Sequence, residues 1–349
     1  MPLVPVYAAG WALRVAGLLL GAERVRRLQW PVISVGNLST GGTGKTPFTI
    51  ALAKLLLAEG LHVDVLSRGY GRRSSAAARV DSDGTAQEFG DEPLLIAREA
   101  GVPVFVASRR YEAGLLAERE SAVRGVHLLD DGFQHRQLAR DADIVLVNSE
   151  DLADRLLPAG NLREPLSALR RATVFAAPVE DEAVVARLRG LGLTQPVWRF
   201  RREMIVPEIV GPVVAFCGIA RPEQFFEGLE KAGVTVAARH AFRDHHRFGD
   251  GDLRMLNGLA KTARAVALVT AAKDRVRLGA LEAGLEAPLL TAGLRVVLED
   301  EVGVAAWLKG AAGSITRAFS PEIFPFVHLP SPLGWAGIPA RLRRSRIRV

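Results

Sequence analysis

The sequence predicts an α/β protein in which a domain built on a parallel sheet is followed by a second, smaller α/β domain. Two observations lead to this prediction. Short apolar runs alternate with helical patterns along most of the 349 residues, and a stretch rich in charge and proline interrupts the series at residues 195–212. Strands separated by helices form βαβ units with parallel strands. The chain is long enough for two domains with sizeable cores.

The first domain is predicted for residues 29–194. Short apolar runs mark its strands, and apolar residues at helical spacing mark the helices between them. The expected strands are Val32–Val35, Val63–Leu66, Val104–Val106, Val126–Leu129 and Ile144–Val147, and the expected helices lie near Thr46–Ala58, Glu92–Ala100 and Arg110–Glu118.

Residues 195–212 hold two aromatic residues, several charges and three prolines, and are predicted to be a linker, with a small hairpin as one form of it. The second α/β domain is predicted for residues 213–325 and a basic C-terminal tail for residues 326–349. The expected strands are Val213–Phe216, Val234–Ala238, Ala265–Val269 and Pro288–Leu290, with helices near Pro222–Lys231 and Gly251–Lys261.

The formal net charge of +7 is concentrated at the C-terminus. The last nine residues, 341–349, carry five arginines and no acid, so the rest of the chain is close to neutral. A broad basic face for nucleic acid is therefore not expected. The single cysteine, Cys217, excludes an intramolecular disulfide framework and a zinc site made of several cysteines.

Residues 1–28 are predicted to form an amphipathic segment that associates with a membrane surface. The apolar run Val4–Leu20 contains Arg14 and is shorter than the roughly 20 residues that a spanning helix needs. Trp11 and several leucines precede a basic cluster at residues 24–27, which is typical of a helix lying in the membrane interface. The alternative is a helix that packs on the protein's own core.

The strongest local signal is Ser39-Thr40-Gly41-Gly42-Thr43-Gly44-Lys45-Thr46, which follows an expected strand and opens an expected helix. This is the context of a P-loop, in which backbone N–H groups and a helix N-terminus hold phosphate oxygens. Lys45 is expected to neutralise the outer phosphates of ATP, and the Thr46 hydroxyl to ligate Mg²⁺. Ser39 stands where the usual pattern has glycine.

Two acidic pairs are candidates for the chemistry beside the P-loop. Asp130 and Asp131 end an expected strand, where a P-loop enzyme places the acid that holds its metal, so they are predicted to bind Mg²⁺. Asp91 and Glu92 open an expected helix, where a carboxylate often serves only as a cap. The helix dipole would also keep such a carboxylate ionised, which suits a general base in phosphoryl transfer.

Adjacent histidines, His245 and His246, follow Asp244 in the second domain. A zinc site is only weakly indicated, because no cysteine lies nearby in the sequence. One of these histidines could instead reach across a cleft between the domains and orient a carboxylate.

Several segments together resemble the tetraacyldisaccharide 4′-kinase family, the lipid A 4′-kinases of Gram-negative bacteria. They occur in the family's order over roughly residues 31–274, and the pieces at residues 67–71 and 130–135 are the most specific. Ala271-Ala272 departs from the Thr-Glu type of pair expected before Lys273. The segments are Ser34-Val35-Gly36-Asn37 leading into Gly41 to Pro47, Leu66 to Gly71, Gly90 to Pro93, Leu129 to His135, Asn161 to Leu166, Gly218 to Ala220, Phe242 to His245 and Thr270 to Asp274.

The resemblance implies transfer of the ATP γ-phosphate to the 4′-hydroxyl of an acylated glucosamine disaccharide 1-phosphate. By position it implies Asp91 as the catalytic base, His245 as its partner and Lys45 as a catalytic phosphate contact. The implied ATP contacts run from Ser39 to Thr46. The implied Mg²⁺ site consists of Thr46, Asp130, Asp131 and Glu164 with Glu92 nearby, and the implied substrate contacts are Arg163, Ser67, Arg68 and Tyr70.

The resemblance also implies ATP and Mg²⁺ as cofactors, and a glycolipid substrate and a membrane surface as partners. The protein would be peripheral or monotopic on the cytoplasmic face of the bacterial inner membrane. The physical argument agrees, because a lipid substrate requires a site near the bilayer. A cleft between two domains could close to exclude water, which competes as phosphoryl acceptor.

Three alternatives stay open. A soluble P-loop ATPase of the dimerising switch or metallochaperone type often has a second lysine ahead of the glycine pair, where this chain has Thr40. A kinase for a small soluble metabolite would have no use for an apolar N-terminal segment. A non-enzymatic membrane adaptor would have no use for Lys45, Thr46 and the surrounding carboxylates.

Overall fold

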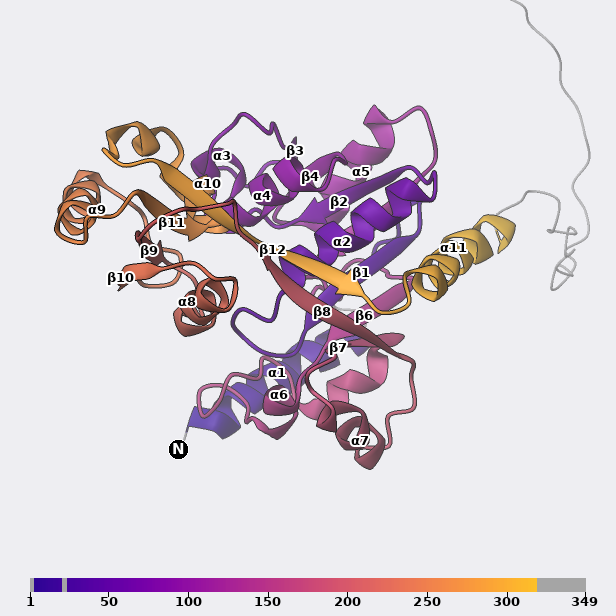
Figure 1. Ribbon diagram of the computed structural model, residues 1–349. Coiled ribbons are helices and arrows are strands. Elements are labelled where there is room, and N and C mark those ends of the chain that lie inside the picture. Colours follow the sequence, from indigo (N-terminus) through magenta and orange to yellow (C-terminus); the bar gives the residue numbers. More distant parts are fainter. Residues whose placement is uncertain (1–2, 21–23, 319–349) are drawn as a thin grey trace, which may run out of the picture.

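The computed structural model describes residues 3–20 and 24–318, and its strands form one continuous twisted sheet flanked by helices (Figure 1). The strand order is β10-β9-β11-β12-β8-β7-β6-β1-β5-β2-β4-β3. Two lobes share this sheet. The predicted α/β class with a dominant parallel sheet is therefore confirmed.

The first lobe contains six neighbouring parallel strands, from β7 to β4, with the short β3 added antiparallel at the edge. All five strands predicted here are present. The elements are β1 (Val32–Asn37), α2 (Lys45–Ala58), β2 (Val63–Ser67), β3 (Ala78–Arg79), α3 (Ala86–Phe89), α4 (Asp91–Glu99), β4 (Val104–Val106), α5 (Arg110–Glu120), β5 (Val126–Asp130), β6 (Ala142–Leu146), α6 (Ser149–Ala153), the 3₁₀ helix η1 (Leu166–Arg171), β7 (Val174–Pro178) and α7 (Ala183–Gly190).

The second lobe is smaller and is built on three parallel strands that continue into the first half of β12. All four strands predicted for it are present as well. Its elements are β9 (Val213–Cys217), α8 (Pro222–Lys231), β10 (Val236–Ala241), α9 (Asp250–Thr262), β11 (Ala267–Ala271), α10 (Ala272–Leu278), the 3₁₀ helix η2 (Gly279–Gly284) and β12 (Leu289–Leu298).

The predicted linker is not a loose connection, because half of it forms the nine-residue strand β8 (Val197–Ile205) inside the sheet. Trp198 and Phe200 alternate with Arg199 and Arg201, which is the period of a strand with one apolar face. β8 pairs in parallel with β7 and antiparallel with the second half of β12. The two lobes are thus joined by a hydrogen-bonded ribbon of two strands.

The C-terminal helix α11 (Glu301–Ala318) also departs from the predicted arrangement. No helix was predicted here, and these residues were assigned to the second domain, yet α11 returns to the first lobe beside α2 (Figure 1). Leu308 is fully buried in the core cluster of that lobe, and Trp307 meets Trp198 edge-on at 5.2 Å. Burial of this apolar face decides the position of the helix. The predicted tail 326–349 lies outside the described residues.

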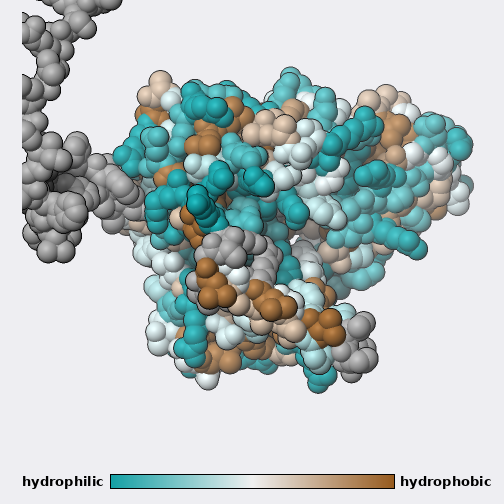
Figure 2. Space-filling view, turned by 180° about the vertical axis from the view of Figure 1, so that it is seen from behind, coloured by the Kyte–Doolittle hydropathy of each residue, from teal (hydrophilic) through white to brown (hydrophobic). Residues whose placement is uncertain are grey.

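The N-terminal segment forms helix α1 (Leu3–Leu19) on the outside of the first lobe. None of its described side chains is buried, and Val6 and Leu13 are 66% and 73% exposed. Figure 2 shows apolar side chains in brown over the lower part of the rear face, where α1 lies. The Tyr7 hydroxyl donates a hydrogen bond to the Arg163 carbonyl. No helix in the described part of the chain has the length and apolar character to span a bilayer.

A buried ionic cluster lies inside the first lobe at the amino-terminal end of β5. The imidazole Nδ1 of His127 lies 2.7 Å from Asp64, Nε2 lies 3.5 Å from Glu118, and the ring stacks on Trp30. Burial by itself lowers the pKa of His127, but the charges and hydrogen bonds of Asp64 and Glu118 outweigh it and raise the pKa to about 9. His127 is therefore protonated in the folded protein at neutral pH.

This cluster predicts a stability that falls in mildly alkaline solution. Because the folded pKa of His127 lies above its unfolded value of about 6.5, the contribution is complete below that pH and is lost as the pH rises through about 9. His127→Gln should lower the free energy of unfolding by about 3–5 kcal/mol at pH 7. It should also reduce the loss of stability between about pH 6.5 and about pH 9. Urea denaturation across this range measures both effects. His62→Gln, at a histidine that touches the same Trp30, is the matched control, and an equally steep decline in both variants would contradict the assignment.

Candidate active site

The predicted site residues gather where the carboxyl ends of strands from both lobes face one another. In the first lobe β1 leads into the P-loop, β2 ends at Ser67 and β5 ends at Asp130. In the second lobe β10 leads to His245, and β11 leads directly into α10. This is the edge of a parallel sheet at which ligands bind.

The P-loop is present as predicted, between β1 and α2. Gly44 caps α2 with φ 85°, a left-handed conformation that favours glycine. Lys45 opens the helix, and its Nζ lies 3.0 Å from the Asn37 Oδ1 and 3.6 Å from an Asp131 carboxylate oxygen. Thr46 follows in the first helical turn. Lys45 is thus held by a neutral oxygen and one carboxylate at the mouth of the loop.

Asp131 and Arg163 form a bidentate ion pair beside Lys45. Both guanidinium Nη atoms donate to the two carboxylate oxygens at 3.0–3.1 Å, and Arg163 also donates to Asn37. Burial alone would raise the pKa of Asp131, but Lys45, Arg163 and Arg110 outweigh it and hold the pKa well below its usual range. Asp131 is therefore ionised, and its charge is already matched by cations.

Asp130 has the opposite electrostatic character. It is almost completely buried, and it accepts hydrogen bonds from the hydroxyls of Thr49 at 3.3 Å and Ser67 at 3.4 Å. Burial and the neighbouring charges of Glu92 and Asp131 raise its pKa to about 7, against the opposing effect of Lys45. A buried carboxylate with too little positive charge around it would be stabilised by a divalent cation.

These donors fit Mg²⁺ in the way that phosphoryl-transfer enzymes hold it. Mg²⁺ prefers oxygen ligands and is usually bound by one or two carboxylates together with the phosphates of the substrate. Thr46 and Asp130 supply a hydroxyl and such a carboxylate. No cluster of three or more His, Cys, Asp or Glu side chains suited to a metal occurs in the described part of the chain. A site completed by nucleotide phosphates needs no such cluster.

Asp91 is the first residue of α4, and its position depends on Gly90. Gly90 has φ 91°, and a Cβ there would lie 3.0 Å from the Gly69 Cα, so only glycine allows the two loops to approach. The Asp91 carboxylate lies 3.2 Å from the Nδ1 of His245, which stands 154 residues further along the chain. The predicted pairing of Asp91 with a histidine of the second lobe is present in the geometry.

Two basic residues of α10 complete the surroundings of Asp91, and neither had been given a role from the sequence. The Arg277 guanidinium lies 2.6 Å from the Asp91 carboxylate, and the Lys273 Nζ lies 3.8 Å from it and 2.8 Å from Glu92. Burial raises the pKa of Asp91, but His245, Lys273 and Arg277 outweigh it and hold the pKa well below its usual range. Asp91 is therefore an anion at any physiological pH.

A pattern in the sequence could have pointed to this pair. Lys273 and Arg277 stand four residues apart, on one face of a helix that starts at the carboxyl end of a strand.

Arg110, the first residue of α5, also lies near the site and was not among the predicted site residues. It is buried, and burial lowers its pKa to about 10 although the charges of Asp131 and Asp130 act to raise it. Its nearness to those carboxylates is a product of the tertiary fold.

The remaining predicted residues are distributed unevenly. Tyr70 meets the His245 ring at 5.6 Å, which places it beside the Asp91–His245 pair. Arg68 is exposed, and its positive charge adds to the burial that lowers the pKa of Arg110. Glu164, predicted near Mg²⁺, is buried in an ion pair with Arg171 at 2.9 Å. In this structure Glu164 therefore faces a guanidinium.

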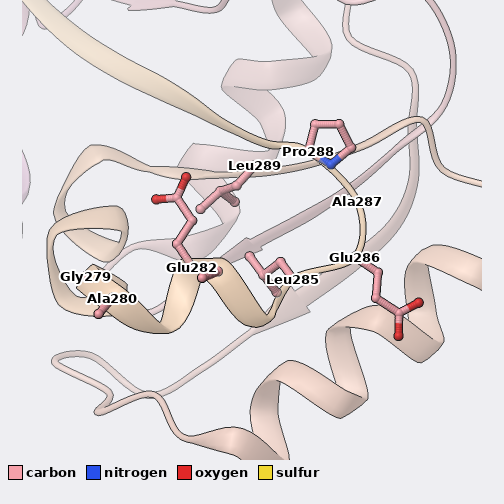
Figure 3. Close-up of a pocket in the computed structure, with 9 residues that line it drawn as sticks. Gly279, Ala280, Glu282, Leu285, Glu286, Ala287, Pro288 and Leu289 are labelled. Carbon is pink, nitrogen blue, oxygen red and sulfur yellow. The ribbon is translucent and has the colours of Figure 1, made fainter.

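A shallow hollow in the second lobe is separate from this site. It is lined by the segment from Gly279 to Leu289 around η2 (Figure 3). Its acidic side chains have partners, since Glu282 pairs with Arg275 and Glu286 with Lys261. None of the predicted site residues lines it, and it presents no convergent polar groups for a ligand.

Comparison with known proteins agrees with this geometry. A model of the Tetraacyldisaccharide-1-P 4′-kinase family matches residues 1–312. The chain is 44% identical over 310 residues to the tetraacyldisaccharide 4′-kinase of Koribacter versatilis, covering 86% of this chain and 94% of the relative. It is 41% identical over 336 residues to the kinase of that name from Anaeromyxobacter dehalogenans, covering 87% and 85%.

A solved structure is similar over nearly the whole fold. It is the crystal structure of "apo" form LpxK from Aquifex aeolicus in complex with ATP, which superposes with a TM-score of 0.70 at 32% identity and covers 89% of this chain and 98% of that one. The family match, the identities and the shared fold lead to one conclusion. This chain belongs to the tetraacyldisaccharide 4′-kinase family.

Proposed function

We propose that the chain transfers the γ-phosphate of ATP to the 4′-hydroxyl of a tetraacyldisaccharide 1-phosphate, a step of lipid A biosynthesis. The observation that carries this proposal is the buried Asp91 carboxylate, held across the lobes by His245 and facing the same sheet edge as the P-loop. The membership of the family and the ATP complex of the Aquifex relative support it.

In this proposal Asp91 is the general base. Its low pKa makes it a weak base, which suits a loose transition state in which the hydroxyl proton leaves late. His245 and Arg277 bind the carboxylate and orient one oxygen toward the acceptor hydroxyl. Because both partners belong to the second lobe, the base is correctly oriented only when the lobes are together.

Lys45 and the P-loop backbone would bind the phosphates of ATP. Lys45 is held 3.6 Å from Asp131 and could exchange that contact for a phosphate oxygen. Thr46 and Asp130 would hold Mg²⁺, with Asp131 and Glu92 nearby, and the metal would neutralise charge on the transferred group. Arg163 and Tyr70 flank the base and the loop, where they would contact the anionic sugar.

The exposed apolar side chains of α1 support association with a membrane surface. Val6 and Leu13 of α1 and Leu20 directly after it are mostly exposed, and the Tyr7 bond to the Arg163 carbonyl keeps the helix next to the substrate side of the site. A helix lying on the bilayer would then present the sugar of an embedded lipid to Asp91. The place of action would be the cytoplasmic face of the bacterial inner membrane, where ATP is supplied. The proposed acceptor is a glycolipid and not a nucleic acid.

A soluble ATPase switch or a kinase of a small metabolite is less well supported. Neither explains why an exposed apolar helix contacts the site or why the base requires a second lobe. An acceptor assay separates the three functions, because only the proposed one places the label of radiolabelled ATP in a lipid fraction.

Asp91→Asn should abolish that transfer. With acylated disaccharide 1-phosphate and radiolabelled ATP, we expect the rate to fall by roughly 10²–10⁴-fold, the usual contribution of a general base. ATP affinity should change little, because Asp91 does not contact the P-loop in the structure. Label reaching the lipid at the wild-type rate would exclude Asp91 as the base.

His245→Ala should lower kcat at saturating substrates by roughly 10²-fold, because the base loses its orienting partner. His246→Ala is the control. The neighbouring His246 bonds Asp252 at 2.9 Å and does not touch Asp91. If the two variants had the same kcat as the wild type, the pairing would have no role in catalysis.

Asp130→Asn should raise the Mg²⁺ concentration that supports half-maximal activity by tenfold or more, on the order of the loss of one charged metal ligand. Chelation of Mg²⁺ should stop the wild-type reaction. Asp141→Asn, at a carboxylate that accepts from the Val32 N–H at the opposite edge of the sheet, is the control. An unchanged Mg²⁺ requirement in Asp130→Asn would remove this residue from the metal site.

A further inference from the structure

Arg202 lies at the point where the ribbon leaves the first lobe. β8 pairs with β7 only as far as Phe200, whereas its pairing with β12 continues through Arg202, opposite Val296, to Ile205. Beyond Phe200 the two strands continue the sheet from the first lobe toward the second. A side chain at this position can touch the first lobe while its backbone belongs to the connection.

The side chain of Arg202 reaches the P-loop from outside. Its Nη2 donates a hydrogen bond to the Thr43 carbonyl at 3.1 Å. The guanidinium also lies against Gly44, where an added Cβ would stand 3.4 Å from the Arg202 Nε. The residue is half-buried, and burial lowers its pKa from the usual value. Arg202 remains cationic, since an arginine pKa starts above 12.

The position of Arg202 is fixed by the core beneath it. Phe200, two residues earlier on the same face of β8, is fully buried and meets Phe48 of α2 at a ring distance of 5.3 Å. The guanidinium carbon lies 5.4 Å from the centre of the Phe200 ring, within range of a cation–π contact. The strand that carries Arg202 is thus tied to the helix that the P-loop opens.

The hydrogen bond from Arg202 to the Thr43 carbonyl also affects the direction of the Gly44 N–H. In a trans peptide the C=O of one residue and the N–H of the next point in opposite directions. The bond between Thr43 and Gly44 is trans, so drawing the Thr43 carbonyl toward Arg202 turns the Gly44 N–H away from it. The N–H groups of this part of a P-loop are the ones that cradle phosphate oxygens.

We propose that Arg202 is a positioning residue for the ATP phosphates, which holds the Thr43–Gly44 peptide in the orientation that aims its N–H at them. This inference rests on the proposed function, since it assumes that the P-loop binds ATP. Arg202 supports the loop from outside, whereas Lys45 is held by Asn37 and Asp131 at the loop mouth. Because Arg202 is carried by the ribbon, the loop is also coupled to the strand pair that bears the second lobe.

The test compares Arg202→Met and Arg202→Lys in the full chain with Arg201→Met. Arg202→Met keeps the apolar stem and removes the donors, and Arg202→Lys keeps one cationic donor. Arg201 is the neighbouring, exposed residue of the same strand and makes no contact with the P-loop in the structure. Calorimetric titration with MgATP, without acceptor, measures affinity, and steady-state assays give the KM for ATP and for the glycolipid.

We expect Arg202→Met to weaken MgATP binding about tenfold or more, the effect of losing one hydrogen bond from a charged donor. The KM for ATP should rise in parallel, with the KM for the glycolipid unchanged. The MgATP affinity of Arg202→Lys should stay within about threefold of the wild-type value, and that of Arg201→Met should equal the wild-type value. The melting temperatures of the three variants should be alike.

Wild-type ATP affinity in Arg202→Met would overturn the inference. So would an equal loss in Arg202→Met and Arg202→Lys, because the cause would then be packing and not the donated bond. A wild-type protein that binds ATP but phosphorylates no glycolipid would refute the proposed function instead, and the affinity comparison would still decide the role of Arg202.

Discussion

The buried carboxylate of Asp91 is the constraint on which the arrangement of the lobes depends. A carboxylate taken out of water costs several kcal/mol unless charges and hydrogen bonds replace its hydration. Here the compensation comes from His245, Lys273 and Arg277, all of the second lobe. Separation of the lobes would return these groups to water. The contact between the lobes and the orientation of the Asp91 carboxylate therefore depend on the same groups.

The three aspartates of the site are the same residue type, but their environments give them different pKa values. Asp91 and Asp131 are surrounded by cations and have low pKa values, whereas Asp130 lies among other carboxylates and has a pKa raised to about 7. Groups whose environments push their pKa values apart usually carry different roles. In the proposed function Asp91, whose charge is matched by cations, is the oriented proton acceptor, and Asp130, which lacks such cations, would bind the divalent cation.

The ribbon of β8 and β12 joins the two lobes that carry these charged groups. It is the covalent and hydrogen-bonded route between the lobes, and it passes beside the P-loop at Arg202. Residues 195–212 were predicted as a linker because they combine several charges with prolines. Trp198 and Phe200 alternate with arginines, but this alternation is recognised as a strand only once the partner strand is known. That partner, β12, starts more than eighty residues later in the chain.

Local patterns were sufficient for the elements and for the phosphate loop, because a strand, a helix start and a P-loop are each specified within about ten neighbouring residues. The sequence by itself determined the α/β class, the position of Lys45 and Thr46, and the acids at the strand and helix ends. Only the tertiary structure decided that α11 returns to the first lobe, that Glu164 faces Arg171, and that Arg110, Lys273 and Arg277 surround the carboxylates. The reason is that these contacts join residues from different elements, often far apart along the chain. Which charged side chains meet is therefore set by the packing of whole elements, and no local pattern encodes it.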